Sequence, residues 1–149
     1  MVIVLEPLPS IIIIKIVSET EAFCYNFYMQ KIGIESSLVE EIRKGNKTIE
    51  GRLGKPRFLE LKEGNLLSVR EDLWHDGKII DSFSDSSIIK ITQILYFESF
   101  KEMVNAIDFQ AAVPSAKTSK EAIKKYKEYY SDKDEEEYGV VAILFELVA

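Results

Sequence analysis

The last apolar segment of the chain places the strongest constraint on its fold. The residues after Gly139 read VVAILFELV, and Glu146 is the only charged position among them. A short run with so few polar positions is typical of a strand that is buried on both faces over most of its length. Such a strand belongs in the middle of a sheet. We therefore expect other segments to supply strands on either side of it.

Several segments have the alternation and turn signals of those neighbouring strands. The Asp76-Gly77 dipeptide lies in the segment DLWHDGK, which predicts a hairpin loop, and it favours a tight turn there. A second turn is predicted at the EGN segment, residues 63–65. The expected strands are residues 29–34, 47–52, 66–71, 79–83 and 88–97.

Three spacings of the capping-box type predict helices. A hydroxyl residue is followed three positions later by a glutamate, so that each side chain can satisfy an unpaired backbone N–H of the first turn. The pairs are Ser37 with Glu40, Ser99 with Glu102, and Thr118 with Glu121, and the expected helices are residues 37–44, 100–107 and 118–130. The run DKDEEE at 132–137 is interpreted as a solvated acidic loop. The predicted fold is α+β, a small β-barrel of about five to seven mostly antiparallel strands with about three short peripheral helices.

The first 28 residues differ in character from the rest of the 149-residue chain. The β-branched runs at 1–5 and 11–17, separated by Pro7 and Pro9, predict one or two short strands in an extension that precedes a domain at 29–149. This apolar extension needs cover, either from the domain's own sheet or from a second copy in a homodimer. A third interpretation is that Met29 is the native start and the extension has little function.

Composition excludes several classes of function. The net charge of −6 and pI near 5.0 argue against non-specific coating of nucleic acid, although a local basic patch can still bind a defined piece. Cys24 and His75 are the only residues of their kinds, so we expect no disulfide framework, no metal site, no cofactor held by them and no Ser–His–Asp triad. No apolar run is long enough for a membrane helix, and the N-terminus lacks a basic signal region, so a cytoplasmic location is predicted.

The strongest functional signal is a basic stretch at residues 43–57. It holds six basic side chains against the single acid Glu50, a local net charge of +5, and contains three glycines. If 47–52 is a strand, Thr48, Glu50 and Arg52 share one face, and Lys47, Ile49 and Gly51 share the other. This pattern predicts a binding site for an anionic ligand. The alternative is a solvated edge strand on which the charges prevent aggregation.

The same stretch resembles a known family. Gly45, Lys47, Thr48, Glu50 and Arg52 match the G-x-K-T-x-E-x-R signature of the ASCH family, and the order of segments is similar over about 29–148. The resemblance implies a PUA-like β-barrel, with an RNA-binding cleft where the barrel meets the helices. Lysine and arginine would then contact phosphates, and Glu50 would accept hydrogen bonds from a base or sugar. The candidate RNA- or nucleotide-binding residues are Lys47, Thr48, Glu50, Arg52, Lys55, Arg57 and, for stacking on a base, Tyr129.

An enzymatic alternative comes from the same resemblance. One bacterial branch of the family hydrolyses N4-acetylcytidine with a lysine, a threonine and a glutamate. Lys47 matches that lysine, Glu50 occupies the position of the threonine, and the glutamate has no clear counterpart. In this alternative the chain is a small amidohydrolase with Lys47 and Glu50 as catalytic residues, Glu50 acting as a base on water. A lysine base or nucleophile needs a lowered pKa, which a nearby carboxylate opposes unless it points across the pleat.

Two further segments are candidates for covering the cleft. The loop at 108–117, which contains Pro114, is long enough for a functional loop and is predicted to lie over the site. Trp74, in the predicted hairpin loop, is interpreted as a packed residue of a lid, with a surface anchor as the alternative.

Overall fold

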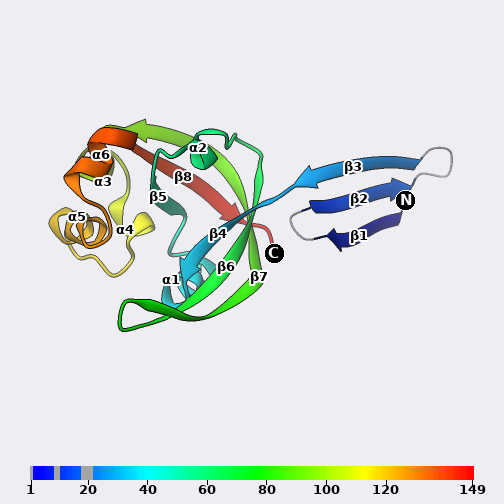
Figure 1. Cartoon of the computed structure of the whole chain (residues 1–149), viewed down its shortest axis with the longest axis horizontal. Helices are drawn as coiled ribbons and strands as arrows, with labels where there is room; N and C mark the ends of the chain where they lie inside the picture. Colours follow the sequence, from blue (N-terminus) through cyan, green and yellow to red (C-terminus); the bar gives the residue numbers. More distant parts are fainter. Residues whose placement is uncertain (1, 9–10, 18–21) are drawn as a thin grey trace.

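The computed structural model describes residues 2–8, 11–17 and 22–149 and contains two sheets. The first is an antiparallel sheet of three strands in the order β1-β2-β3, namely β1 (Val2–Leu8), β2 (Ile11–Val17) and β3 (Ala22–Tyr28). It stands to one side of the rest of the molecule, and β3 leads directly into the second sheet (Figure 1). The extension thus contributes three strands in place of the one or two predicted, because residues 22–28 also pair.

The second sheet is a curled five-stranded half-barrel in the order β4-β6-β7-β8-β5. Only the pairing of β4 with β6 is parallel, and the other pairings are antiparallel. The predicted α+β barrel of mostly antiparallel strands is therefore confirmed. The strands are β4 (Gln30–Glu35), β5 (Ile49–Leu53), β6 (Leu66–His75), β7 (Lys78–Phe97) and β8 (Val140–Leu147).

The closing strand β8 is buried on both faces, as its sequence predicts. It lies between β7 and β5, and its residues alternate between two hydrophobic clusters. Val141 and Ile143 belong to the cluster inside the curled sheet, whereas Val140 and Ala142 belong to the cluster beneath the helices. Burial on both sides explains why the strand has almost no polar positions.

Six helices surround the sheet in the part of the chain that the structure describes, three more than predicted. The predicted ones are α1 (Ser36–Arg43), α3 (Phe100–Ala106) and α5 (Ser119–Lys127). The others are α2 (Pro56–Leu59), α4 (Phe109–Ala112) and α6 (Asp132–Tyr138). No helix in the described ranges is long and apolar enough to cross a membrane.

Two predictions about helices are wrong. The acidic run at 132–137 is helix α6 and not a loop, because Ser131 and Asp134 form a capping box in which each side chain accepts the other's backbone N–H. The box predicted at Ser37 does not form, since α1 begins one residue earlier and no side chain caps it. At α3 and α5 the predicted hydroxyls of Ser99 and Thr118 do cap the helix.

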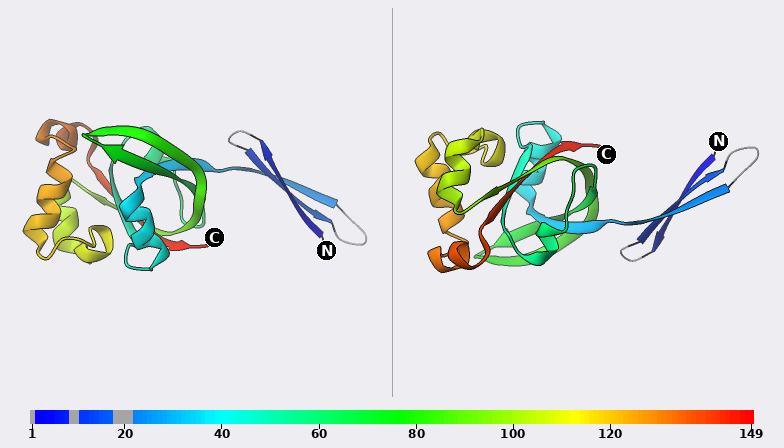
Figure 2. Two further views of the ribbon diagram at one scale, coloured as in Figure 1. Left: turned by 90° about the horizontal axis from the view of Figure 1, so that it is seen from below. Right: turned by 90° about the horizontal axis from the view of Figure 1, so that it is seen from above.

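The β6–β7 hairpin is longer than the sequence predicts. Asp76 and Gly77 form the turn with positive φ angles of 48° and 72°, so the predicted Asp-Gly turn is present. The flanking residues, which the sequence predicts to be loop, continue the strands as far as His75 and Lys78. The tip of the hairpin therefore projects beyond the barrel, on the side where the helices pack (Figures 1 and 2).

Candidate functional site

The signature strand β5 separates two environments. Glu50 and Arg52 pair with Ile143 and Val141 of the inner cluster, whereas Ile49 belongs to the cluster beneath the helices. At Gly51 an added Cβ would lie 2.8 Å from both the Met103 Cε and the Tyr126 Oη. The glycine thus allows the helices to pack closely on one face of the strand, while the other face carries the acid and the base.

Lys47 is buried two residues before this strand begins, with 2% of its surface exposed. Its Nζ donates to the carbonyl oxygens of Ile49 (2.7 Å) and Ala112 (2.6 Å) and lies 2.9 Å from Oε2 of Glu50. A lysine ammonium has three N–H donors, and these three partners use them all. Lys47 therefore joins β5, α4 and Glu50, with no donor left for a ligand in this arrangement.

Glu50 lies between two cations. One carboxylate oxygen faces Lys47, and the other accepts from the Arg52 Nε at 2.8 Å. Burial opposes the charged form of Glu50, but Lys47 and Arg52 outweigh it and hold its pKa below the usual value. Glu50 consequently remains ionised near neutral pH and is a weak base.

Arg52 is the member of this network that reaches the surface. Its Nη2 donates to the carbonyl oxygen of Gly33 at 2.5 Å, and its guanidinium lies 5.7 Å from the centre of the Phe58 ring. The side chain is 22% exposed. A guanidinium has five N–H donors, and the contacts to Glu50 and Gly33 use two of them. Three donors thus have no partner among the described residues.

A second arginine approaches Gly33 from the neighbouring strand. Arg70 makes two hydrogen bonds to Asp72, from Nε to Oδ1 at 2.7 Å and from Nη2 to Oδ2 at 2.8 Å. An added Cβ at Gly33 would lie 2.5 Å from the Arg70 Nη2 and 2.5 Å from the Asp72 Oδ2. Two guanidinium groups therefore meet at this one glycine of β4.

Sequence reasoning missed Arg70 and Asp72. The available signal was a base and an acid two positions apart in a strand, the same relationship that singled out Glu50 and Arg52. Asp72 is buried and also accepts from the Ser82 hydroxyl at 2.8 Å. Its hydrogen bonds from Arg70 hold the pKa of Asp72 low, against the effect of burial, and the charge of Arg52 adds to this.

Three tyrosines lie in α5 and in the turn that follows it. Tyr126 and Tyr130 stack on Phe100 with ring centres 4.4 and 5.0 Å apart, so these two pack against the helix cluster. Burial raises the pKa of Tyr130, and the positive charge of Arg52 opposes that rise. Tyr129 is 65% exposed, with its ring 6.5 Å from that of Tyr130. Tyr129 is therefore available to a ligand.

Lys55 and Arg57 are both exposed beyond the end of β5. The Arg57 Nη2 donates to the carbonyl oxygen of Lys31 at 2.5 Å, and its guanidinium lies 4.8 Å from the centre of the Phe58 ring. The Lys55 Nζ lies 5.3 Å from the centre of the Tyr138 ring. Arg52 and Arg57 thus lie over the same phenylalanine, and Lys55 extends the basic surface toward α6.

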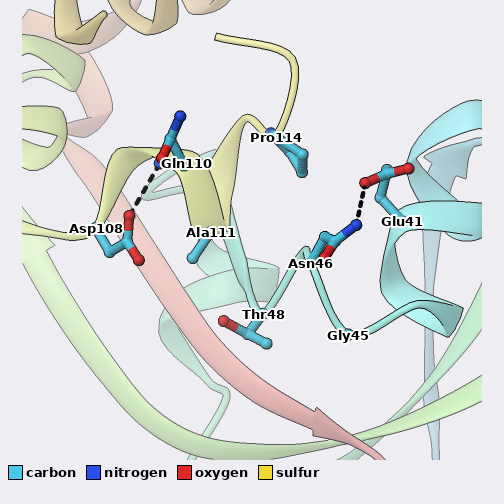
Figure 3. A pocket seen from close by; sticks show the side chains of 8 residues that line it. All are labelled: Glu41, Gly45, Asn46, Thr48, Asp108, Gln110, Ala111 and Pro114. Carbon is cyan, nitrogen blue, oxygen red and sulfur yellow. Dashed lines mark hydrogen bonds between the residues drawn. The ribbon is translucent and has the colours of Figure 1, made fainter. Parts of the chain in front are cut away.

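Thr48 lies in a separate hollow of about 370 Å³ (Figure 3). The loop at 108–117 forms one wall, and the Thr48 N–H donates to the Ala111 carbonyl at 3.0 Å. The loop therefore packs on the start of the signature strand. The lining includes acids and no lysine or arginine, which does not suit an anion. It comprises Glu41, Gly45, Asn46, Thr48, Asp108, Gln110, Ala111 and Pro114.

No group of three or more histidine, cysteine, aspartate or glutamate residues within the described ranges could hold a metal ion. The buried acids instead pair with cations of the chain, as Glu50 does with Lys47 and Arg52.

The structure is that of a small α+β domain, a curled half-barrel with a Lys–Glu–Arg network at its edge strand. The sequence profile of the ASCH domain matches residues 32–149, and the chain belongs to the ASCH domain family. No curated protein matches the sequence.

Solved structures that are similar to this chain include those of two proteins. The crystal structure of hypothetical protein PH0355 is 28% identical, with a TM-score of 0.68, and the match covers 80% of this chain and 99% of that one. The solution structure of protein PF0455 from Pyrococcus furiosus is 27% identical, with a TM-score of 0.62, over 80% of this chain and 97% of that one. Both proteins therefore correspond to most, but not all, of this chain.

Proposed function

We propose that this domain binds RNA or a nucleotide-like anion at Arg52. The observation that carries the proposal is the state of its guanidinium. Glu50 and the Gly33 carbonyl fix its orientation, while three N–H donors remain without a partner among the described residues. A fixed and partly exposed guanidinium can form two parallel hydrogen bonds to a phosphate.

The surroundings of Arg52 support an extended polyanion over a small ion. Lys55 and Arg57 add exposed positive charge at the end of the same strand, on a protein with a net charge of −6. A local basic surface of this kind contacts phosphates without making the whole molecule a non-specific binder. Lys47 is assigned a different role from these residues: it positions Glu50, which in turn orients Arg52.

The exposed ring of Tyr129 supports recognition of a base. Aromatic side chains stack on unpaired bases in single-stranded RNA, whereas bases inside a duplex are already stacked. Tyr129 lies beside Tyr130, whose pKa is influenced by the positive charge of Arg52. A phosphate at Arg52 and a base on Tyr129 would therefore belong to one short segment of RNA.

The geometry favours binding over the amidohydrolase alternative. All three N–H donors of Lys47 are engaged, and Glu50 points toward Lys47 and not across the pleat. The lowered pKa of Glu50 makes it a poor base for activating water. Catalysis by this pair would require both ion pairs to rearrange.

The proposal can be tested by fluorescence anisotropy with a labelled single-stranded RNA at 50 and 200 mM salt. We expect affinity to fall as salt rises, and Arg52→Ala to weaken binding at least tenfold. Arg52→Lys keeps the charge but loses the planar fork and should give an intermediate value. Lys101→Ala removes an exposed charge from α3 and serves as the control for net charge.

Two results would contradict the proposal. One is the absence of salt-dependent binding, and the other is an Arg52→Ala variant that binds as well as Lys101→Ala. Circular dichroism of each variant shows whether the fold survives. Incubation with N4-acetylcytidine tests the alternative, since release of cytidine that is lost in Glu50→Gln would indicate hydrolysis.

A further inference from the structure

We propose that one face of the β6–β7 hairpin forms the second half of this RNA site. In this arrangement Arg70 contacts a phosphate and Trp74 stacks on a base of single-stranded RNA. The inference rests on the proposed function, because it extends the surface that begins at Arg52. The hairpin face is defined here as Arg70, Asp72, Trp74, Ile79 and Ser82.

The strand register places these residues on one face. Arg70, Asp72 and Trp74 alternate along β6, while Ser82 and Ile79 are the cross-strand partners of Asp72 and Trp74. The hydrogen bonds of Asp72 with Arg70 and with Ser82 show that these three side chains do point the same way. The extra residues at the two irregularities of this pairing are on β7, so the alternation on β6 is uninterrupted.

The hairpin face is continuous with the site at Arg52. Arg52 bonds to the carbonyl of Gly33, and Arg70 passes over the Cα of the same residue. The charge of Arg52 also contributes to the low pKa of Asp72. A ligand bound at Arg52 would therefore meet Arg70 next, and Trp74 beyond it.

Exposure makes this face available. The side chain of Arg70 is 41% exposed, Trp74 is 41% exposed, and Ile79 is 44% exposed. A two-stranded ribbon that projects from a barrel with large apolar residues uncovered is typical of a binding surface. Trp74 is therefore a surface anchor in this proposal and not a packed residue.

The chemistry of the hairpin face fits single-stranded RNA. Arg70 and Trp74 are four residues apart on an extended strand, or about 13 Å, so a phosphate at one and a base at the other come from different nucleotides. Alternating cationic and aromatic groups are typical of surfaces that bind unpaired strands. Two of the nearby acids do not oppose this, because Asp81 pairs with Leu73 on the opposite face and Arg70 neutralises Asp72. The third, Asp85, accepts from the Ser68 hydroxyl, which precedes Arg70 on the side away from Trp74.

The single tryptophan of the chain supplies a direct test. Fluorescence of Trp74 is recorded while an unlabelled single-stranded RNA is added to the full chain, in parallel with the anisotropy measurement. We expect quenching with the same midpoint as binding. Trp74→Ala should weaken binding roughly five- to one-hundred-fold, and Trp74→Phe should retain most of the affinity. Phe83→Ala is the matched control, since this exposed aromatic pairs with Glu71 on the opposite face.

The outcomes distinguish failure of the hairpin proposal from failure of the proposed function. If Arg52→Ala weakens binding but Trp74→Ala does not, or if RNA binds without changing Trp74 fluorescence, the hairpin proposal is overturned and the proposed function stands. If no RNA binds, both proposals are overturned. If Trp74 fluorescence changes with protein concentration alone, and Trp74→Ala abolishes this change, the hairpin is an interface between copies of the chain and not an RNA surface.

Discussion

Arg52 joins the two edge strands of the half-barrel by donating from Nη2 to the carbonyl oxygen of Gly33 at 2.5 Å. The sheet order leaves β4 and β5 without a backbone partner on one side, so the two edges would otherwise present unpaired groups. Arg57 makes a second bond of this kind to the Lys31 carbonyl. Arg52 and Arg57, which both bond to carbonyl oxygens of the β4 edge, are thus among the residues proposed to bind the ligand.

Gly33→Ala should disturb the Arg70–Asp72 pair beside the binding site. The new methyl group would meet the ends of the Arg70 and Asp72 side chains, and Asp72 is buried and hydrogen-bonded, so its displacement is costly. We therefore expect a loss of about 1–3 kcal/mol in the free energy of unfolding, with RNA binding weakened several-fold. Urea denaturation and anisotropy measure the two effects. Unchanged binding would mean that the position of Arg70 does not matter to the ligand.

Lys47→Ala should act mainly on stability. Removing a buried ammonium leaves the Ala112 carbonyl unpaired and Glu50 with a single cation, and breaking a buried ion pair costs about 3–5 kcal/mol. Lys55→Ala removes an exposed lysine from the same stretch and should change the free energy of unfolding by less than about 0.5 kcal/mol. If Lys47→Ala were as stable as Lys55→Ala but lost RNA binding, Lys47 would be a contact residue and not a positioning one.

The strands were predictable because their signals are local. Alternation identified the signature strand, and the apolar run after Gly139 identified the central one, since both faces of a buried strand must be apolar. The pairing of Gly33 with Arg70 was not predictable, because it depends on two distant strands lying parallel. The spacing of Arg70 and Asp72 was visible in the sequence, but their position beside Gly33 was not.

Burial of charged residues was the hardest feature to infer. From the sequence alone, Lys47 is expected to be a surface cation. However, β5 begins two residues after it, so its long side chain can turn inward to Glu50. The acidic run of α6 is likewise expected to be a solvated loop, although Glu135 within it is buried. In both cases the partners that make burial possible include groups distant in sequence, such as the Ala112 carbonyl and the Phe100 N–H.

The ion pairs of Glu50 should appear in the pH dependence of stability. Its pKa is lower in the folded chain than the ordinary value of 4.5, so its contribution is fully present above about pH 4.5 and is lost as pH falls through the folded-state pKa. Glu50→Gln should be less stable by about 3 kcal/mol at pH 7, because Lys47 keeps its charge without a carboxylate partner. The difference from the natural chain should shrink below pH 4.5. A difference that stays constant down to pH 3 would show that the charge of Glu50 contributes nothing.

Glu135 should stabilise the corner between α5 and α6, residues 128–131, which carries Tyr129 and Tyr130. One oxygen of its buried carboxylate accepts the Phe100 N–H at 2.8 Å and the other pairs with Lys127, so it ties α6 to the start of α3 and the end of α5. Glu135→Ala leaves a buried donor unpaired and removes an ion pair, which should lower the free energy of unfolding by about 2–4 kcal/mol.

The Glu135→Ala substitution should also affect RNA binding. Tyr130 stacks on Phe100, so loss of the Glu135 contacts should loosen both tyrosines and weaken RNA binding, with line broadening of their ring signals in NMR spectra. Glu136→Ala, which removes the next and exposed acid of α6, is the matched control and should be neutral in both measurements. Equal behaviour of the two variants would show that Glu135 does not hold the corner, and that the tyrosines are positioned by ring packing alone.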